Sequence, residues 1–150
     1  MNEAIGNIAE FDVLAAYLEC NVEGFRGLAS AQKFGDGQSN PTFLLKAESG
    51  KYVLRRQPPG ALLKSAHAVD REYRVMAALR DSEVPVPEVL HLCEDRDVIG
   101  CLFFVMSYVS GVINWNAALP DLAPSNRTRL FDEMNRVLAA LHGVDVAAAG

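Results

Sequence analysis

The chain has 150 residues, of which 50% are hydrophobic and 22% are charged. This size and composition can bury a core and favour a globular fold. The formal net charge of -5 and the pI near 5.1 provide no broad basic surface. Nucleic acid and anionic membranes are therefore not expected partners, and small molecules are favoured.

The three cysteines are Cys20, Cys93 and Cys101, and none of them lies in a C-x-x-C motif. Because three thiols cannot all pair within one chain, we expect buried free cysteines and a reducing compartment. Residues 1–10 lack the basic start and apolar run of a secretory leader, and no apolar stretch approaches the ~20 residues of a membrane span. The sequence thus predicts a soluble, cytoplasmic protein.

The first part of the sequence predicts one helix and three strands. Apolar residues at helical spacing predict a helix over 10–20. Residues 28–34, 42–47 and 52–56 are rich in strand formers, and the turn composition of 48–51 joins the last two strands as a hairpin. The apolar stripe of the helix consists of Phe11, Leu14, Ala15 and Leu18.

The next part predicts a helix followed by two more strands. The helix is expected over about 65–80, with Ser65 as its N-cap. Strands over 89–94 and 102–108 follow, joined by a polar turn at 94–97.

A last helix is predicted from a cap at Ser125 to His142, where Gly143 ends it. One face of this helix is apolar, and too little chain follows to cover that face. We therefore expect something else to pack there, and self-association as a homodimer is the simplest case. The apolar face consists of Leu130, Met134, Val137, Leu138 and Leu141.

The glycine-containing segment 35–41 lies between two predicted strands and is the first candidate site. Glycine at 37 lets backbone N–H groups approach phosphate oxygens, and Ser39 and Asn40 could add donors. Gly-Asp-Gly between strands is also a common turn, so this segment alone leaves both interpretations open.

The second candidate is Glu72, which lies on the apolar stripe of its helix with Ala68, Val69, Val75 and Met76. Burying a carboxylate without a partner is costly, so its position predicts a basic residue from a neighbouring element. The strand 52–56 supplies Arg55 and Arg56, and because side chains alternate along a strand only one of them can face this helix. The alternative is that Glu72 reaches water or pairs with Arg71 or Arg74.

The order of glycine loop, hairpin, basic residue, helix with an inward glutamate and two strands is the layout of a kinase small lobe. Four runs resemble aminoglycoside phosphotransferase-like kinases, and they look most like the branch associated with acyl-CoA dehydrogenases. The runs are Gly-Gln-Ser-Asn-Pro-Thr at 37–42, Tyr-Val-Leu-Arg-Arg-Gln-Pro-Pro-Gly at 52–60, Ser-Ala-His-Ala-Val-Asp-Arg-Glu-Tyr-Arg-Val at 65–75 and Val-Met-x-Tyr-x-x-Gly at 105–111.

The resemblance implies an α+β fold, with a five-stranded antiparallel sheet and one packed helix. An N-terminal helix precedes this small lobe, and the first helix of a large lobe follows it. The resemblance also implies a nucleotide-binding lobe over 1–110 and, over 111–150, a linker with the start of a second lobe. ATP and Mg²⁺ are the implied cofactors, and a small molecule with a hydroxyl group, hydroxyacyl-CoA or aminoglycoside-like, is the implied substrate.

Carried over residue by residue, the resemblance implies that Gly37, Ser39 and Asn40 cover the phosphates. Arg55 takes the place of the usual lysine, held by Glu72. A further set would surround the adenine, with Met106 as the gate and with backbone groups of Ser107 and Val109 facing the base. That set is Val53, Met106, Ser107 and Val109.

The catalytic aspartate of such kinases and the asparagine five residues later are not found. His142-Gly143-Val144-Asp145 has one residue too many for a His-Gly-Asp motif and is interpreted as a helix end. We expect the catalytic loop and the magnesium ligands to lie beyond residue 150. Asp95 and Asp97 are interpreted as solvated turn residues, and His67 and His91 lack metal-ligand spacing.

Two functions follow as hypotheses. The first is the nucleotide-binding part of an ATP-dependent phosphotransferase, inactive by itself. The second is a non-catalytic module that keeps the small-lobe fold and joins a partner through its last helix. An unrelated α+β domain is a third hypothesis, which failure of nucleotide to protect the protein from heat would favour.

Overall fold

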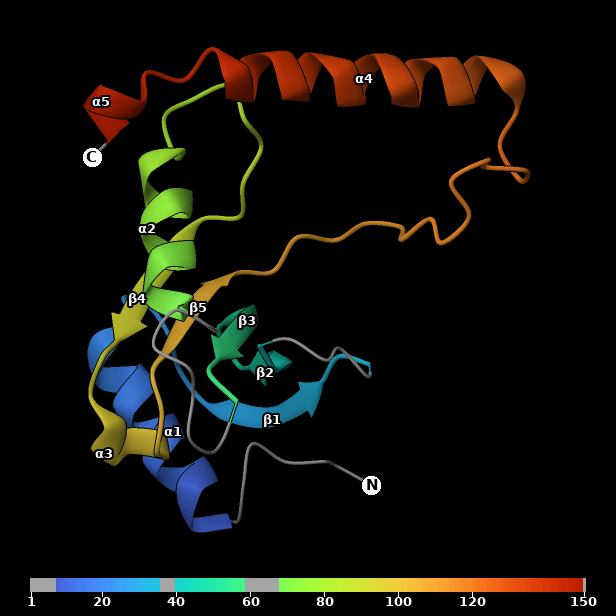
Figure 1. The fold of residues 1–150 in the computed structure, drawn as a ribbon. Coiled ribbons are helices and arrows are strands. Elements are labelled where there is room, and N and C mark those ends of the chain that lie inside the picture. The colour runs from blue at the N-terminus through green and yellow to red at the C-terminus, as the bar shows by residue number, and fades with distance from the viewer. Residues whose placement is uncertain (1–7, 36–39, 59–67, 150) are drawn as a thin grey trace. The chain divides into compact units, whose positions relative to one another are not determined.

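The computed structural model describes residues 8–35, 40–58 and 68–149. They form two compact units (Figure 1). The first unit runs to Ala77 and includes Pro87–Tyr108, and the second comprises Ala78–Val86 and the chain from Val109 onward.

The first unit is built on a five-stranded antiparallel sheet of order β1-β2-β3-β5-β4. Its architecture is the α+β class predicted from the sequence. The strands are β1 (Leu28–Lys33), β2 (Thr42–Ala47), β3 (Gly50–Arg56), β4 (Val89–Cys93) and β5 (Phe103–Ser107). The helices that accompany them are α1 (Ile8–Asn21), α2 (Val69–Ala78) and α3 (Arg96–Ile99).

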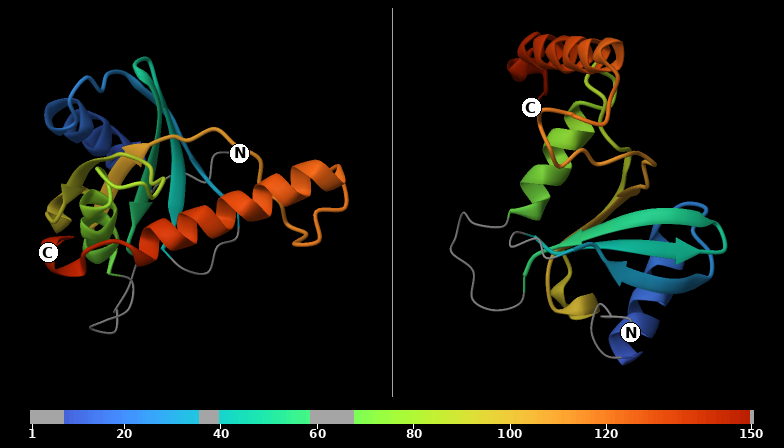
Figure 2. Two further views of the ribbon diagram at one scale, coloured as in Figure 1. Left: turned by 90° about the horizontal axis from the view of Figure 1, so that it is seen from above. Right: turned by 90° about the vertical axis from the view of Figure 1, so that its right-hand side faces the viewer.

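Helices cover both faces of this sheet, α1 on one and α2 on the other (Figure 2). Because successive side chains of a strand point to opposite faces, Leu54 is buried in the core under α1 and its neighbour Val53 is buried on the opposite face. The α1 core contains Leu14, Leu18, Phe25, Leu45, Leu54, Phe103 and Val105, all fully or almost fully buried.

The core on the α2 side is smaller and centres on Val69, Val89 and Phe104. Tyr73 packs edge-on against Phe104, with 6.0 Å between ring centroids. The expectation that Val75 shares this inward stripe is wrong, since 57% of it is exposed. The inward positions are instead Val69, Tyr73, Met76 and Ala77, which follow the i, i+4, i+7, i+8 spacing of one helical face.

The connection from α1 to the sheet depends on Gly27. Its φ of +61° favours glycine, and a Cβ there would lie 2.5 Å from Glu48 Cγ. Its carbonyl accepts from Glu48 N at 3.0 Å, and its amide donates to Glu19 Oε1 at 2.8 Å. The turn thereby ties α1 to the β2–β3 hairpin.

The polar turn expected at 94–97 is instead the short helix α3. Asp95 is its N-cap and accepts a hydrogen bond from Asp97 N at 2.8 Å, while Gly100 ends the helix at a φ of +76°. Asp95 and Asp97 are exposed, as expected. An aspartate cap and a glycine five residues later are the usual signals of a one-turn helix, so the sequence contained this information.

The expected start of the middle helix is also corrected. Ser65 lies outside the described residues, but Ala68 is not helical and α2 begins at Val69. The Ala68 carbonyl accepts from Arg71 N and Glu72 N at 3.1 and 3.2 Å, which closes the first turn. The helix ends at Ala78, two residues before the expected end.

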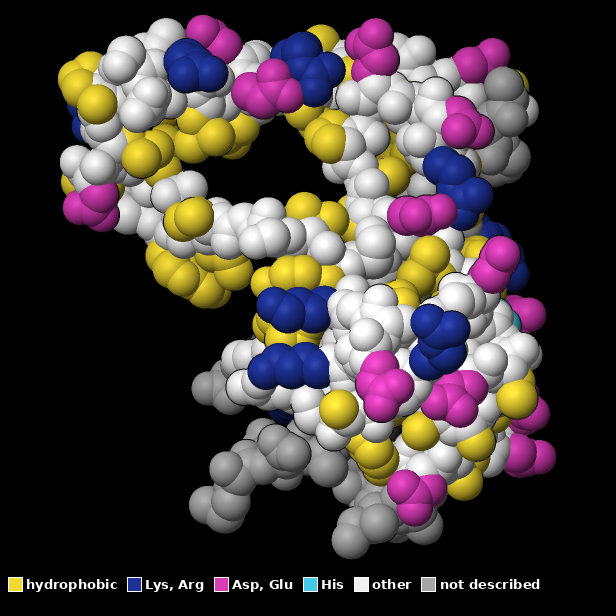
Figure 3. Space-filling view, turned by 180° about the vertical axis from the view of Figure 1, so that it is seen from behind, with side chains coloured by type: hydrophobic (Ala, Val, Ile, Leu, Met, Phe, Trp, Pro, Cys, Tyr) yellow, Lys and Arg dark blue, Asp and Glu magenta, His cyan; other side chains and the backbone are white. Residues whose placement is uncertain are grey.

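The second unit contains α4 (Pro124–His142) and α5 (Val146–Ala149). The N-cap of α4 is Ala123, so the expected cap at Ser125 is wrong, because Pro124 already occupies the first helical position that suits proline. Within this unit the apolar side of α4 is exposed, and hydrophobic side chains gather along the helix (Figure 3). Exposed members are Phe131, Met134, Leu138 and Leu141.

Two other expectations concern single residues and membrane spans. Cys93 and Cys101 are buried free thiols, whereas Cys20 is exposed, so the expectation of burial is wrong for that thiol. Across the described ranges, no helix combines the length and apolarity that a membrane crossing requires.

Candidate functional site

The candidate site lies on the α2 face of the sheet. Antiparallel pairing places Val53 opposite Met106 and Arg55 opposite Phe104. Since residues i and i+2 of a strand share a face, these four side chains line one surface. Val53 and Phe104 are buried, and Met106 packs against the same core. The charged side chain of Arg55 therefore lies beside an apolar strip that contains Val53 and Met106.

An ion pair joins this strand to α2. The Arg55 guanidinium contacts the Glu72 carboxylate through two nitrogens, Nε to Oε2 and Nη2 to Oε1, the latter at 3.3 Å. The two-point contact fits the planar fork of arginine to the planar carboxylate. The side chains are 26% and 36% exposed, so the pair lies at the edge of the core and is accessible to solvent.

Asn40, which precedes β2, and Thr42, its first residue, complete this network. Asn40 Nδ2 donates to Glu72 Oε1 at 2.8 Å, and Arg55 Nη1 donates to Thr42 Oγ1 at 2.9 Å. The Asn40 carbonyl accepts from Arg55 Nη1 at 3.4 Å and from the Thr42 hydroxyl at 3.2 Å. Contacts from the loop before β2, from β2 itself and from α2 thus converge on the Arg55 guanidinium.

The hydrogen-bond capacity of Arg55 is largely used. A guanidinium has five N–H groups, and Glu72, Thr42 and Asn40 accept from four of them, one on Nε, one on Nη2 and two on Nη1. One Nη2 hydrogen remains beyond these contacts. Arg55 is therefore held in position by its partners and keeps one N–H group for an additional hydrogen-bond acceptor.

The other expected site residues divide into three groups. Ser107 ends β5 and exchanges hydrogen bonds with Glu88, its amide donating at 2.8 Å and its hydroxyl accepting at 3.0 Å. Val109 belongs to the second unit and is 65% exposed. Gly37 and Ser39 lie outside the described residues.

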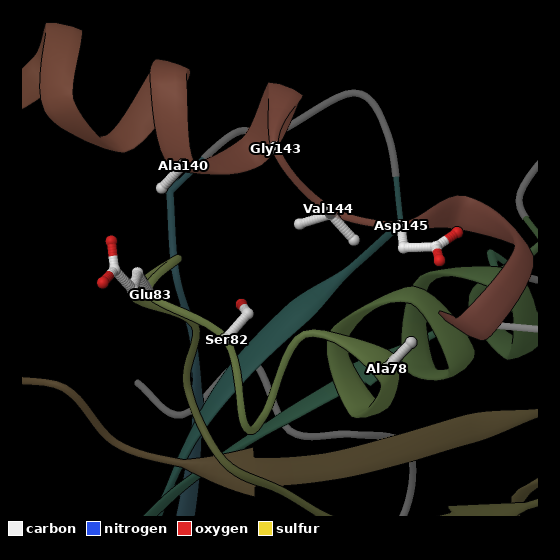
Figure 4. Close-up of a pocket in the computed structure, with 7 residues that line it drawn as sticks. All are labelled: Ala78, Ser82, Glu83, Ala140, Gly143, Val144 and Asp145. Atoms are coloured by element: carbon white, nitrogen blue, oxygen red, sulfur yellow. The ribbon is translucent and has the colours of Figure 1, made fainter.

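A hollow in the second unit is lined by none of the expected site residues (Figure 4). Its lining residues include Ser82, Glu83 and Asp145. Asp145 also accepts from Ala147 N at 2.9 Å at the start of α5, so the His142–Asp145 segment is a helix end, as the sequence predicts. Among the described residues, no group of three or more His, Cys, Asp or Glu side chains could hold a metal ion.

Shifted pKa values occur on the opposite side of the sheet, where α1 meets β4. Tyr17 Oη and His91 Nε2 are hydrogen-bonded at 2.9 Å. Burial raises the pKa of the Tyr17 hydroxyl and lowers the pKa of His91. Both shifts favour the neutral forms, which is the behaviour of groups that stabilise a core contact.

Residues 30–150 match the phosphotransferase enzyme family, APH. The chain belongs to this family. Its fold agrees with the crystal structure of a Ralstonia eutropha protein described as an aminoglycoside phosphotransferase, with a TM-score of 0.80 and 46% identity. That alignment covers 93% of this chain and 40% of the other. Enzymes of this family use ATP.

Two curated relatives carry acyl-CoA dehydrogenase names. The Arabidopsis thaliana protein named probable acyl-CoA dehydrogenase IBR3 is 46% identical over 94% of this chain. Mouse acyl-CoA dehydrogenase family member 10 is 47% identical over 77% of it. The chain spans only 18% and 11% of the lengths of these relatives, and the resemblance to the dehydrogenase-associated branch is confirmed.

Sequence reasoning missed one member of the network, Thr42, and gave Asn40 a different partner. A threonine at the start of a strand is common, and its spacing carries no sign of a bond to Arg55. That Asn40 covers the phosphates stays a prediction. In the structure its side-chain amide donates to Glu72 and the residue is only 5% exposed. A glutamate carboxylate can accept more hydrogen bonds than one arginine donates to it. The need for a further donor, such as Asn40, was therefore the available signal.

Proposed function

We propose that this chain forms the nucleotide-binding lobe of an ATP-dependent phosphotransferase that phosphorylates a hydroxyl group of a small molecule. The observation that carries the proposal is the Arg55–Glu72 ion pair, positioned beside the apolar strip of Val53 and Met106. An apolar strip suits a nucleobase, and a fixed cation next to it suits phosphate oxygens.

The residues present fit a bound triphosphate. Arg55 remains partly exposed and has one Nη2 hydrogen beyond its contacts with described residues, so it can donate to a phosphate oxygen without leaving Glu72. Glu72 prevents the cation from moving away when the site is empty. We further propose that Val53 and Met106 contact the adenine and that the carbonyl of Ser107 faces its polar edge.

The proposal assigns binding, and not chemistry, to the described residues. When bound, ATP supplies the phosphoryl group, and Arg55 offsets part of the charge on its phosphates. Magnesium is proposed as the second cofactor from the chemistry of phosphoryl transfer. None of its ligands is assigned to the described residues, and neither is a catalytic base.

For the acceptor, we propose a hydroxyacyl-CoA in preference to an aminoglycoside. The support is the pair of relatives with acyl-CoA dehydrogenase names at 46% and 47% identity. A dehydrogenase of that class acts on acyl thioesters, so a kinase associated with it would most economically take a hydroxylated member of the same pool.

The test is an activity assay on the full-length protein, meaning the phosphotransferase of which this chain would be the nucleotide-binding lobe. The assay contains Mg²⁺ and ATP, with hydroxyacyl-CoA thioesters and aminoglycosides as acceptors. The proposal predicts ADP release that depends on the thioester and is absent with the aminoglycoside. Dependence on the aminoglycoside would contradict the acceptor class. Failure of ATP to bind at all would contradict the proposed function.

The exposed apolar side of α4 favours a second candidate function, a non-catalytic module that binds a partner or a second copy. Phe131, Met134 and Leu138 are each about half exposed, which is unusual for a helix that faces only water. A full-length protein that self-associates and shows no ATP binding would favour this candidate.

A further inference from the structure

We propose that Asn40 is a positioning residue for nucleotide binding, acting through Glu72 and not by touching the phosphates. This inference rests on the proposed function and adds a third member to the ion pair on which that function depends. Asn40 is one of only a few buried polar side chains in the described residues, at 5% exposure.

The direction of each hydrogen bond follows from the chemistry of the groups. A carboxylate only accepts, so the Asn40 amide must donate to Glu72 Oε1, with Nδ2 at 2.8 Å. The same oxygen accepts from Arg55 Nη2 at 3.3 Å. Asn40 therefore fixes the orientation of the carboxylate plane, and the carboxylate plane determines where the guanidinium lies.

The backbone of Asn40 acts on the other end of the same cation. Its carbonyl accepts from Arg55 Nη1 at 3.4 Å and from Thr42 Oγ1 at 3.2 Å. With its hydrogen directed at this carbonyl, the Thr42 hydroxyl presents a lone pair to Arg55 Nη1 at 2.9 Å. One residue thus orients both the anion that holds Arg55 and the hydroxyl that accepts from it.

Asn40 and Arg55 would therefore have different roles in nucleotide binding. The amide of Asn40 is directed at Glu72 and the residue is only 5% exposed, so its side chain offers little surface to a ligand. Its contribution to affinity comes from the position of Arg55, which retains one Nη2 hydrogen for a ligand. Substituting Asn40 should then weaken ATP binding, and the loss of affinity should be larger the more the substitution displaces the Arg55 guanidinium.

The discriminating comparison is Asn40→Asp against Asn40→Ala in the full-length protein, with ATP affinity measured by calorimetric titration. Asn40→Asp keeps the size of the side chain and replaces the donor by a carboxylate facing Glu72. If Asn40 serves only to fill space, Asn40→Asp is the milder change. If it serves as a donor to Glu72, Asn40→Asp is the more damaging, because two carboxylates repel at this distance.

We expect affinity to fall roughly tenfold in Asn40→Ala, the size of effect that loss of one hydrogen bond to a charged group gives, and further in Asn40→Asp. The charged groups in contact with position 40 include Glu72 from α2 and Arg55 from β3.

Asn21→Ala is the matched control, since that asparagine is exposed and donates to the carbonyl of Tyr17 in α1. If wild type binds ATP and Arg55→Ala weakens it, but Asn40→Ala binds like Asn21→Ala, the positioning role of Asn40 is overturned and the proposed function stands. Asn40→Asp milder than Asn40→Ala would also overturn it. If wild type fails to bind ATP, the proposed function falls and takes this inference with it.

Discussion

Glu72→Gln changes the charge at the centre of the network and preserves the size of the side chain. Glu72 accepts three hydrogen bonds, from Arg55 Nε, from Arg55 Nη2 at 3.3 Å and from Asn40 Nδ2 at 2.8 Å. Glutamine offers one oxygen and one donating NH₂ group. At least one donor therefore loses its acceptor, and the Arg55 guanidinium loses its counter-charge.

The magnitude follows from the exposure of the pair. Removing one partner of a buried ion pair costs about 3–5 kcal/mol, whereas exposed pairs contribute about 0.2–1 kcal/mol. Arg55 and Glu72 are 26% and 36% exposed, which places them between these limits, so we expect a loss of about 2 kcal/mol. For a domain of about 150–250 residues this lowers the Tm by roughly 4–8 °C.

The assay is thermal unfolding of the full-length protein without nucleotide, following the transition of this lobe. Glu133→Gln is the matched control, because Glu133 pairs with Arg136 on the surface of α4 with side chains 55% and 48% exposed. Glu133→Gln should leave the Tm unchanged. A Tm for Glu72→Gln that matches that of Glu133→Gln would refute the view that the ion pair braces the lobe.

Two further predictions concern stability away from the site. Burial lowers the pKa of His91, so below a pH of about 6.5 the unfolded state binds more protons and stability falls as the pH drops. His91→Gln should flatten this dependence in thermal unfolding, and an unchanged slope would contradict the assignment. Gly27→Ala introduces a Cβ at a φ of +61°, whereas Gly111 has no positive φ in the strained range and nothing within 4 Å of its Cβ position. Gly27→Ala should therefore cost about 1–2 kcal/mol of backbone strain, Gly111→Ala should cost less, and equal losses in urea unfolding would count against a strained turn at Gly27.

Much of the fold followed from periodicity and composition. The β2 strand has the predicted bounds, Thr42–Ala47, because strand formers there are flanked by proline and by a tight turn. A cationic partner for Glu72 was predictable because a carboxylate on an inward stripe needs a counter-charge and alternation along β3 leaves one arginine facing α2. The choice of Arg55 over Arg56 came from the family resemblance, and the ion pair confirms it.

The errors have local physical causes. Val75 was assigned to the buried stripe of α2, but the helix has its inward face at Val69, Tyr73 and Met76, where the Tyr73 ring packs against Phe104. The roles of Asn40 and Thr42 depend on how the chain enters β2 and on contacts between residues far apart in sequence. Such contacts leave no periodic signal in the sequence, so they could not be predicted from it.

The most direct test of the central claim is calorimetric titration of ATP into the full-length protein and its Arg55→Ala variant. Arg74→Ala is the control, an arginine of α2 that is 66% exposed and pairs with Asp70 and Glu94. If Arg55 holds the phosphates, loss of its charged hydrogen bond should weaken ATP binding by roughly 10- to 100-fold, and Arg74→Ala should bind as wild type does. Equal affinity of Arg55→Ala and wild type would contradict the claim that this ion pair serves nucleotide binding.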